Sequence, residues 1–189
     1  MIVGMADRDF VTEASHRNRG VTLIELLIVI VLIGILSGIA ASRLDWTKYR
    51  ADAVSRGVMA DLSLAQRRAV SLQENVRIII PDSARLQVHE DANDDNAIES
   101  GERVVTYPLD HDFIFAQGSA PDLSLADDPT ALTALTFRRD GSANRSGTFY
   151  ISGPGYDPTC KHCRAVAVSR ATGRVTWYSY ATGAWQQAN

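Results

Sequence analysis

The sequence predicts an α+β fold in which one long N-terminal helix packs on an antiparallel β-sheet domain. Residues 21–41 form an apolar run with a single charge, and a proline-free amphipathic stretch continues it to residue 75. The remainder consists of short β-branched and aromatic segments separated by turn residues, as in small sheets. No repeat and no crossover helix interrupts these segments, which favours antiparallel pairing.

Composition indicates one modest domain with an anchor. The chain has 189 residues, of which 46% are hydrophobic, and its net charge is −3 with a pI near 5.8. This charge gives no general sign of nucleic-acid binding. The four histidines are accompanied by no G-x-S-x-G or other nucleophile context and by no phosphate loop. We therefore expect neither an enzyme nor a required cofactor.

The N-terminal segment differs from a secretory signal peptide. Residues 1–20 are polar, and Arg17 and Arg19 stand directly before the apolar run, which keeps that end cytoplasmic by the positive-inside rule. The small residue Gly20 precedes the apolar run, whereas a secretory signal is cut after its apolar core. Cleavage at Gly20 would leave the apolar segment in the mature protein and the remaining chain outside the membrane.

Residues 21–42 are long enough for a transmembrane helix, since about 20 residues cross a bilayer. Glu25 is the one charge from Val21 to Ala41, and a charge there costs roughly 2.5–3.5 kcal/mol on insertion scales and is usually functional. Gly34 and Gly38 form a small-xxx-small face that permits close helix packing, although glycine is also common in membrane helices in general.

The stretch Arg19–Ile39, in which Gly20 precedes Val-Thr-Leu-Ile-Glu and an uncharged helix, resembles the class III signal of type IV prepilins. The resemblance implies that a prepilin peptidase cuts between Gly20 and Val21 and methylates the new amine of Val21. It also implies that Glu25 of one subunit pairs with this amine on a neighbouring subunit in a filament. The family usually has Phe where this chain has Val21.

The helix is expected to continue through residues 43–75. Apolar residues recur there at intervals of three and four, which places them on one stripe of an amphipathic helix. Because such a stripe needs an apolar partner surface, we expect it to pack on the sheet domain. Continued to the first strand, the stripe consists of Ala51, Val54, Val58, Leu62, Ala65, Ala69, Leu72 and Val76.

Residues 76–189 are expected to form the β-rich domain, with residues 117–133 as its most mobile loop. The candidate strands are short, rich in β-branched and aromatic residues, and bounded by Asp, Asn, Gly and Pro. They are Val76–Ile80, Leu86–His89, Val104–Tyr107, Phe113–Ala116, Leu135–Phe137, Thr148–Ser152, Ala165–Ser169 and Val175–Tyr180.

Three segments of the soluble part resemble the GspH/FimT family of minor pilins and pseudopilins. They are LAQRRAVSLQENVRI at residues 64–78, FRRDGSANRSGTFYIS at 137–152 and RAVAVSRATGRV at 164–175. The motifs occur in the order expected of the family, after the prepilin-like N-terminus. The resemblance implies a pilin-like fold and a structural role in a filament.

The segment DANDDNAIESGE, residues 91–102, matches the spacing of a calcium-binding loop. Asn96 replaces the usual glycine, and the flanks predict strands instead of EF-hand helices. The alternative is a solvated hairpin turn, which we favour, and family members often carry a similar acidic turn. The ligands would be Asp91, Asn93, Asp95, the Ala97 carbonyl, Glu99 and Glu102.

The segment CKHC allows three interpretations. In an oxidising compartment, a disulfide between Cys160 and Cys163 is favoured. A zinc site with His162 would need a fourth ligand, and the sequence has no second cysteine pair. A thioredoxin-like redox centre should open a helix, whereas the preceding GPGYDPT predicts a loop.

The segment SRATGRVTWYSY places Arg170 and Arg174 near Trp177 and two tyrosines, a composition able to bind DNA through charge and stacking. Some members of the resembled family bind DNA through a Gly-Arg-x-Arg turn, and here Thr176 replaces the second arginine. The favoured interpretation is a hairpin turn with aromatic side chains packed on the sheet.

Together these features predict a minor pilin or pseudopilin of the GspH/FimT type. The precursor would be a single-pass protein of the inner membrane with a periplasmic C-terminal domain. After cleavage it would enter, and help to initiate, a type IV pilus or a type II secretion pseudopilus. The expected partners are other pilins, prepilin peptidase, the inner-membrane assembly platform and the lipid bilayer, with DNA as the alternative.

Overall fold

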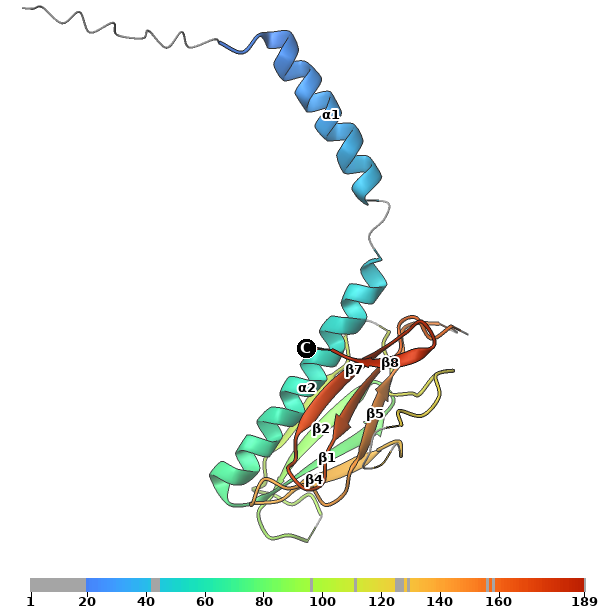
Figure 1. The fold of residues 1–189 in the computed structure, drawn as a ribbon. Coiled ribbons are helices and arrows are strands. Elements are labelled where there is room, and N and C mark those ends of the chain that lie inside the picture. Colours follow the sequence, from blue (N-terminus) through green and yellow to red (C-terminus); the bar gives the residue numbers. More distant parts are fainter. Residues whose placement is uncertain are drawn as a thin grey trace, which may run out of the picture. The chain divides into compact units, whose positions relative to one another are not determined.

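The computed structural model describes residues 20–41, 45–95, 97–110, 112–124, 128, 130–155, 157 and 159–188, with only the backbone of Ala40 and Ala41. The chain divides into two compact units, Met1–Leu44 and Asp45–Asn189, and each is described separately (Figure 1). The predicted leader lies outside the described residues except for Gly20.

The first unit contains helix α1, Leu23–Ala41, inside the predicted 21–42 segment. Thr22 begins it, because its hydroxyl accepts the Glu25 N–H at 3.3 Å and its carbonyl accepts the Leu26 N–H at 3.2 Å. Over the residues that the structure describes, no helix combines the length and the apolar character that a membrane span requires.

The second unit begins with helix α2, Trp46–Leu72. The Asp45 side chain caps it by accepting the Lys48 N–H at 3.2 Å, and Gln73 ends it in a left-handed conformation at φ 58°. The sequence predicted one continuous helix; the structure has two, and Asp45, at φ −87° and ψ 85°, lies outside the helical conformation and caps the second.

The predicted apolar stripe of α2 is largely confirmed. Its buried side chains include Ala51, Val54, Val58, Leu62, Ala65 and Ala69. Leu72 was wrongly included, since it lies in the last turn and is exposed. Ser55 was missed, and its buried hydroxyl donates to the Ala51 carbonyl at 2.8 Å, which satisfies it within the helix.

The strands of the unit, over the residues that are described, form two antiparallel sheets of four strands each. The first has the order β3-β2-β1-β4, with β1 Asn75–Asp82, β2 Arg85–Asp91, β3 Val104–Pro108 and β4 Ala134–Phe137. The second has the order β5-β6-β7-β8, with β5 Gly147–Ile151, β6 Arg164–Val168, β7 Val175–Ala181 and β8 Ala184–Gln187. Every strand pair is antiparallel, as predicted.

Two strand predictions were wrong. Residues 113–116 form no strand, because only Ile114 makes a β-bridge, an isolated one with Ser152. The side chain of Phe113 is instead buried in the core. Strand β8 was missed because Ala-Trp-Gln-Gln lacks β-branched residues. It follows a tight turn in which Thr182 and Gly183 both have positive φ, 52° and 82°.

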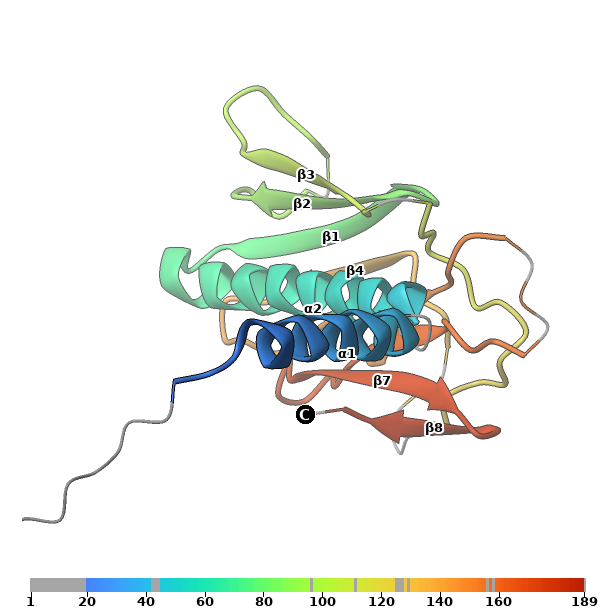
Figure 2. The same cartoon turned by 90° about the horizontal axis from the view of Figure 1, so that it is seen from above.

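Helix α2 packs on both sheets, so one core holds the unit together. Figure 2 shows α2 lying over the line between the sheets, with β1, β2 and β3 on one side and β7 and β8 on the other. The core joins the helix stripe to Val76 and Ile78 of the first sheet and to Phe149 and Val166 of the second. The amphipathic stripe is therefore what orders the domain.

Candidate functional site

The N-terminal segment presents the predicted processing and assembly residues on or beside α1. Gly20 and Val21 precede the helix and are exposed, and Glu25 lies in its first turn. The large apolar side chains of α1 are between 49% and 84% exposed, on every side of the helix. A helix that is apolar all round needs lipid or other helices around it.

Glu25 occupies a particular position at the start of the helix. With Thr22 at the N-cap, it stands at the third helical position, the place of the acid in a capping box. A carboxylate in a first helical turn is also favoured by the helix dipole. Gly34 and Gly38 lie four residues apart on the same helix face and leave its backbone uncovered there.

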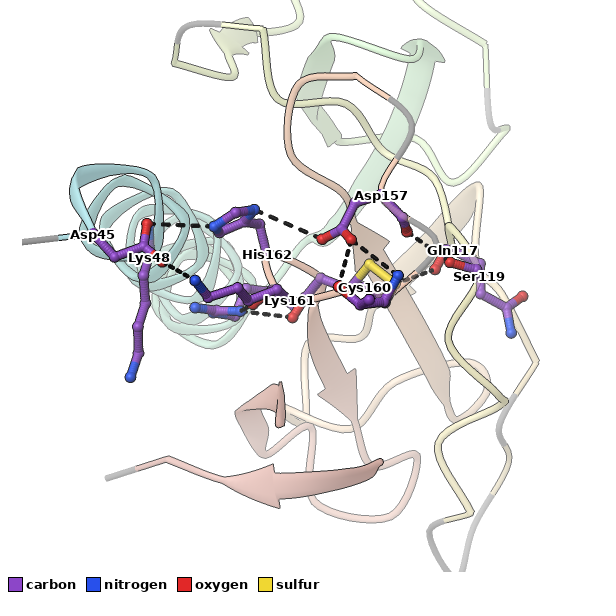
Figure 3. A network of polar contacts seen from close by, with 11 residues as sticks. Asp45, Lys48, Gln117, Ser119, Asp157, Cys160, Lys161 and His162 are labelled. Carbon is purple, nitrogen blue, oxygen red and sulfur yellow. Dashed lines mark hydrogen bonds and ion pairs between the residues drawn. A yellow bond between two sulfur atoms is a disulfide. The ribbon is translucent and has the colours of Figure 1, made fainter. Parts of the chain in front are cut away.

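A polar cluster ties the CKHC loop to the start of α2 (Figure 3). Lys161 Nζ lies 2.6 Å from Asp45 Oδ2, and His162 Nε2 lies 3.5 Å from Asp45 Oδ1. His162 Nδ1 is 3.7 Å from Asp157 Oδ2 on its other side. The hydrogen bond from Lys161, with that from the Lys48 N–H, lowers the pKa of Asp45 to about 2. The helix cap is therefore also an ion-pair partner.

Cys160 and Cys163 are joined by a disulfide and are both buried. Gly118 packs against the two sulfurs at φ +66°, and a Cβ there would lie 2.9 Å from Cys163 Sγ. A side chain would therefore push the loop off the bridge. Strand β6 follows directly, without the helix that a thioredoxin-like centre requires, and the bonded sulfurs are not zinc-ligating thiolates.

A buried ion pair that the sequence analysis missed lies beside this cluster. The Arg164 side chain is 1% exposed, and its Nε donates to Asp52 Oδ1 at 2.7 Å. Its Nη1 donates to the carbonyl of Cys163 at 2.8 Å and to that of Lys161 at 3.2 Å. The pair links α2 to β6 across 112 positions, so nothing in the local sequence pattern pointed to it.

The acidic turn after β2 is held by hydrogen bonds among its own residues. Glu102 Oε2 lies 2.7 Å from Nε2 of the buried His89, and the Glu102 carboxylate accepts the N–H groups of Ala92 and Glu99. These hydrogen bonds, that of His89 first, lower the pKa of Glu102.

The other predicted calcium ligands are spread along the same turn. Asn93 Nδ2 donates to Asp95 and to Glu99, and Asp95 Oδ1 accepts the Ala97 N–H at 2.7 Å. Asp91 is buried at the end of β2, and Asn96 lies outside the described residues. In the part of the chain that the structure describes, no group of three or more His, Cys, Asp or Glu side chains is placed to hold a metal ion.

The turn between β6 and β7 contains the predicted DNA-contacting residues. Arg170 and Arg174 are exposed, and Gly173 adopts φ +63° in the turn. Trp177 is 5% exposed, packs in the core and lies under the Arg56 guanidinium at 5.4 Å. Because Tyr178 is buried as well, neither of these two aromatic side chains is exposed for stacking against DNA bases. The DNA interpretation is therefore not supported.

One further titratable group was missed. Asp61 lies on α2 in a cleft of about 210 Å³, with Val58, Leu86 and Tyr107 among the lining residues. Burial in this apolar setting raises the pKa of Asp61 to about 6. No sequence pattern marked Asp61, because one acidic residue within an amphipathic helix is ordinary.

Comparison with known proteins assigns the chain to a class and then to a family. Residues 15–41 match the prokaryotic N-terminal methylation motif. Residues 54–173 match the family described as type II transport protein GspH. The chain belongs to this family of minor pilins and pseudopilins, as the sequence resemblance predicted. No curated protein sequence matches it significantly.

The chain is also similar to two solved structures. The type IV minor pilin FimU of Pseudomonas aeruginosa is 18% identical, with 72% of this chain and 92% of that chain covered and a TM-score of 0.47. The minor pseudopilin EpsH of the Vibrio cholerae type II secretion system is 17% identical, with 75% and 99% covered and a TM-score of 0.48.

Proposed function

We propose that this chain is a structural subunit that is cut between Gly20 and Val21, methylated on Val21 and built into a periplasmic filament. The N-terminal methylation motif, with Glu25 as the one charge in the otherwise uncharged helix α1, is the observation that carries the proposal. Before cleavage, α1 would hold the precursor in the inner membrane. In the filament, α1 would pack among the helices of other subunits.

Cleavage would work as a switch for assembly. An ionised carboxylate in an apolar surrounding is costly unless it is paired. The amine of Val21 exists only after the cut, and it would supply the Glu25 carboxylate of a neighbouring subunit with an opposite charge. A subunit would therefore enter the filament only after it has been cut before Val21. The function is assembly, not catalysis.

The experiment compares Glu25→Ala with Glu25→Asp in cells that express the filament system. We expect Glu25→Ala to be processed and membrane-associated but missing from purified filaments. Glu25→Asp keeps the charge and should be incorporated at a measurable, reduced level. Wild-type incorporation of Glu25→Ala would show that the carboxylate has no part in assembly. Co-purification with pilus or with secretion components identifies the filament.

A further inference from the structure

The first turn of α2 is surrounded by exposed aromatic and basic side chains. Trp46 and Tyr49 are 65% and 61% exposed, and Lys48 and Arg50 are exposed as well. Large aromatic side chains with a polar end favour the boundary between lipid and water. We call these four residues the collar of α2.

The position of the collar along the chain limits its distance from α1. Helix α1 ends at Ala41 and α2 begins at Trp46. Five residues reach at most about 18 Å when fully extended. The headgroup layer adds roughly 5–8 Å to each side of the hydrocarbon core. With α1 in the bilayer, the collar therefore lies at the level of the headgroups or just above it.

The charges of this region leave an excess of cations. Of the carboxylates in this region, Asp45 is paired with Lys161 and Asp52 with Arg164, while Asp157 faces His162. Neither Lys48 nor Arg50 takes part in the ion pairs found among the described residues. A cleft of about 470 Å³ opens beside Lys48 and is lined also by Lys161 and Tyr180. Such a surface attracts anionic headgroups.

We propose that the collar, with the cleft beside Lys48, binds the phosphate headgroups of anionic phospholipids at the outer face of the inner membrane. This rests on the proposed function, because α1 must anchor the chain. Trp46 and Tyr49 lie among the headgroups, while Lys48 and Arg50 approach lipid phosphates. The contact holds the start of α2 on the membrane before the subunit enters a filament.

The test uses the full chain in vesicles that contain phosphatidylglycerol or phosphatidylcholine alone. The contribution of Trp46 to fluorescence is the difference between wild type and Trp46→Phe. We expect a quencher on the lipid headgroup to reduce this signal more than a quencher at mid-chain, and more strongly in phosphatidylglycerol vesicles. Lys48→Gln/Arg50→Gln should lower the ratio of docked to undocked domains in these vesicles roughly tenfold or more.

The matched control is Arg170→Gln/Arg174→Gln, which removes the same charge from another exposed site. The Gln66 side chain of α2 donates to the Thr172 carbonyl, so this turn lies beside Gln66. Gln66 is some 20 residues from Trp46 along the helix, or about 30 Å. This control should behave as wild type.

Flotation with the vesicles in high salt reports the anchor separately. Equal Trp46 quenching in both lipids, or no effect of the Lys48/Arg50 variant, would overturn the collar proposal and leave the anchor intact. A chain that does not float would overturn both.

Discussion

Replacing Asp52 by Asn should destabilise the domain more than any comparable change of a surface acid. The substitution keeps the size of the side chain and removes its charge. It leaves the Arg164 guanidinium, which is 1% exposed, with two carbonyl acceptors and no anion. Breaking a fully buried pair in this way costs about 3–5 kcal/mol. Because the Asp52 side chain is 21% exposed, solvent reduces the expected loss to about 2–3 kcal/mol.

For a unit of this size, each kcal/mol lowers the melting temperature by roughly 2–4 °C. We therefore expect Asp52→Asn to melt roughly 5–10 °C below wild type when the full chain is heated in detergent and followed by near-UV circular dichroism. The control is Asp94→Asn, which makes the same change in the exposed pair with Arg139 and should cost less than about 1 kcal/mol. Equal shifts for the two variants would refute the buried-pair reasoning.

Further predictions concern other parts of the domain. Asp61→Asn should stabilise the protein by about 1 kcal/mol at pH 7.5 and by little at pH 4. The raised pKa means that the folded state binds more protons between about 4 and 6, so wild-type stability falls as pH rises there; a pH-independent difference in melting temperature would contradict this. Cys160→Ala/Cys163→Ala should lose about 2 kcal/mol by chemical denaturation, and the native protein should resist thiol alkylation without reductant; ready labelling would argue against the bridge. Millimolar calcium should leave the melting temperature unchanged, because Glu102 is engaged by His89 and two backbone N–H groups; a clear rise would restore the calcium interpretation.

The periodic features of the fold could be predicted from the sequence. Residues such as Ala51, Leu62 and Ala69 recur with the helical period because one face of α2 is buried against the sheets. Most strands were found for the same reason, since their β-branched residues fit a half-buried pleated surface. Strand β8 escaped because an edge strand of Ala, Trp and Gln depends on its turn and its neighbour, not on its own composition.

The long-range contacts could not be predicted. An aspartate before a helix indicates at most an N-cap. Only the folded chain brings Lys161 and His162 to the carboxylate of Asp45. The Asp52–Arg164 pair depends on the packing of α2 against β6, which no local spacing encodes. In contrast, Gly20, Val21 and Glu25 were predicted because they lie within six consecutive residues of a recognised motif.

The most direct test of the central claim is the intact mass of the protein extracted from membranes of cells that contain the processing enzyme. We predict a mature chain that begins at Val21, lacks residues 1–20 and carries one added methyl group on its N-terminal amine. A Gly20→Ala substitution should reduce this product and leave the precursor in the membrane. A full-length wild-type mass, or a chain cut after the apolar segment, would contradict the account.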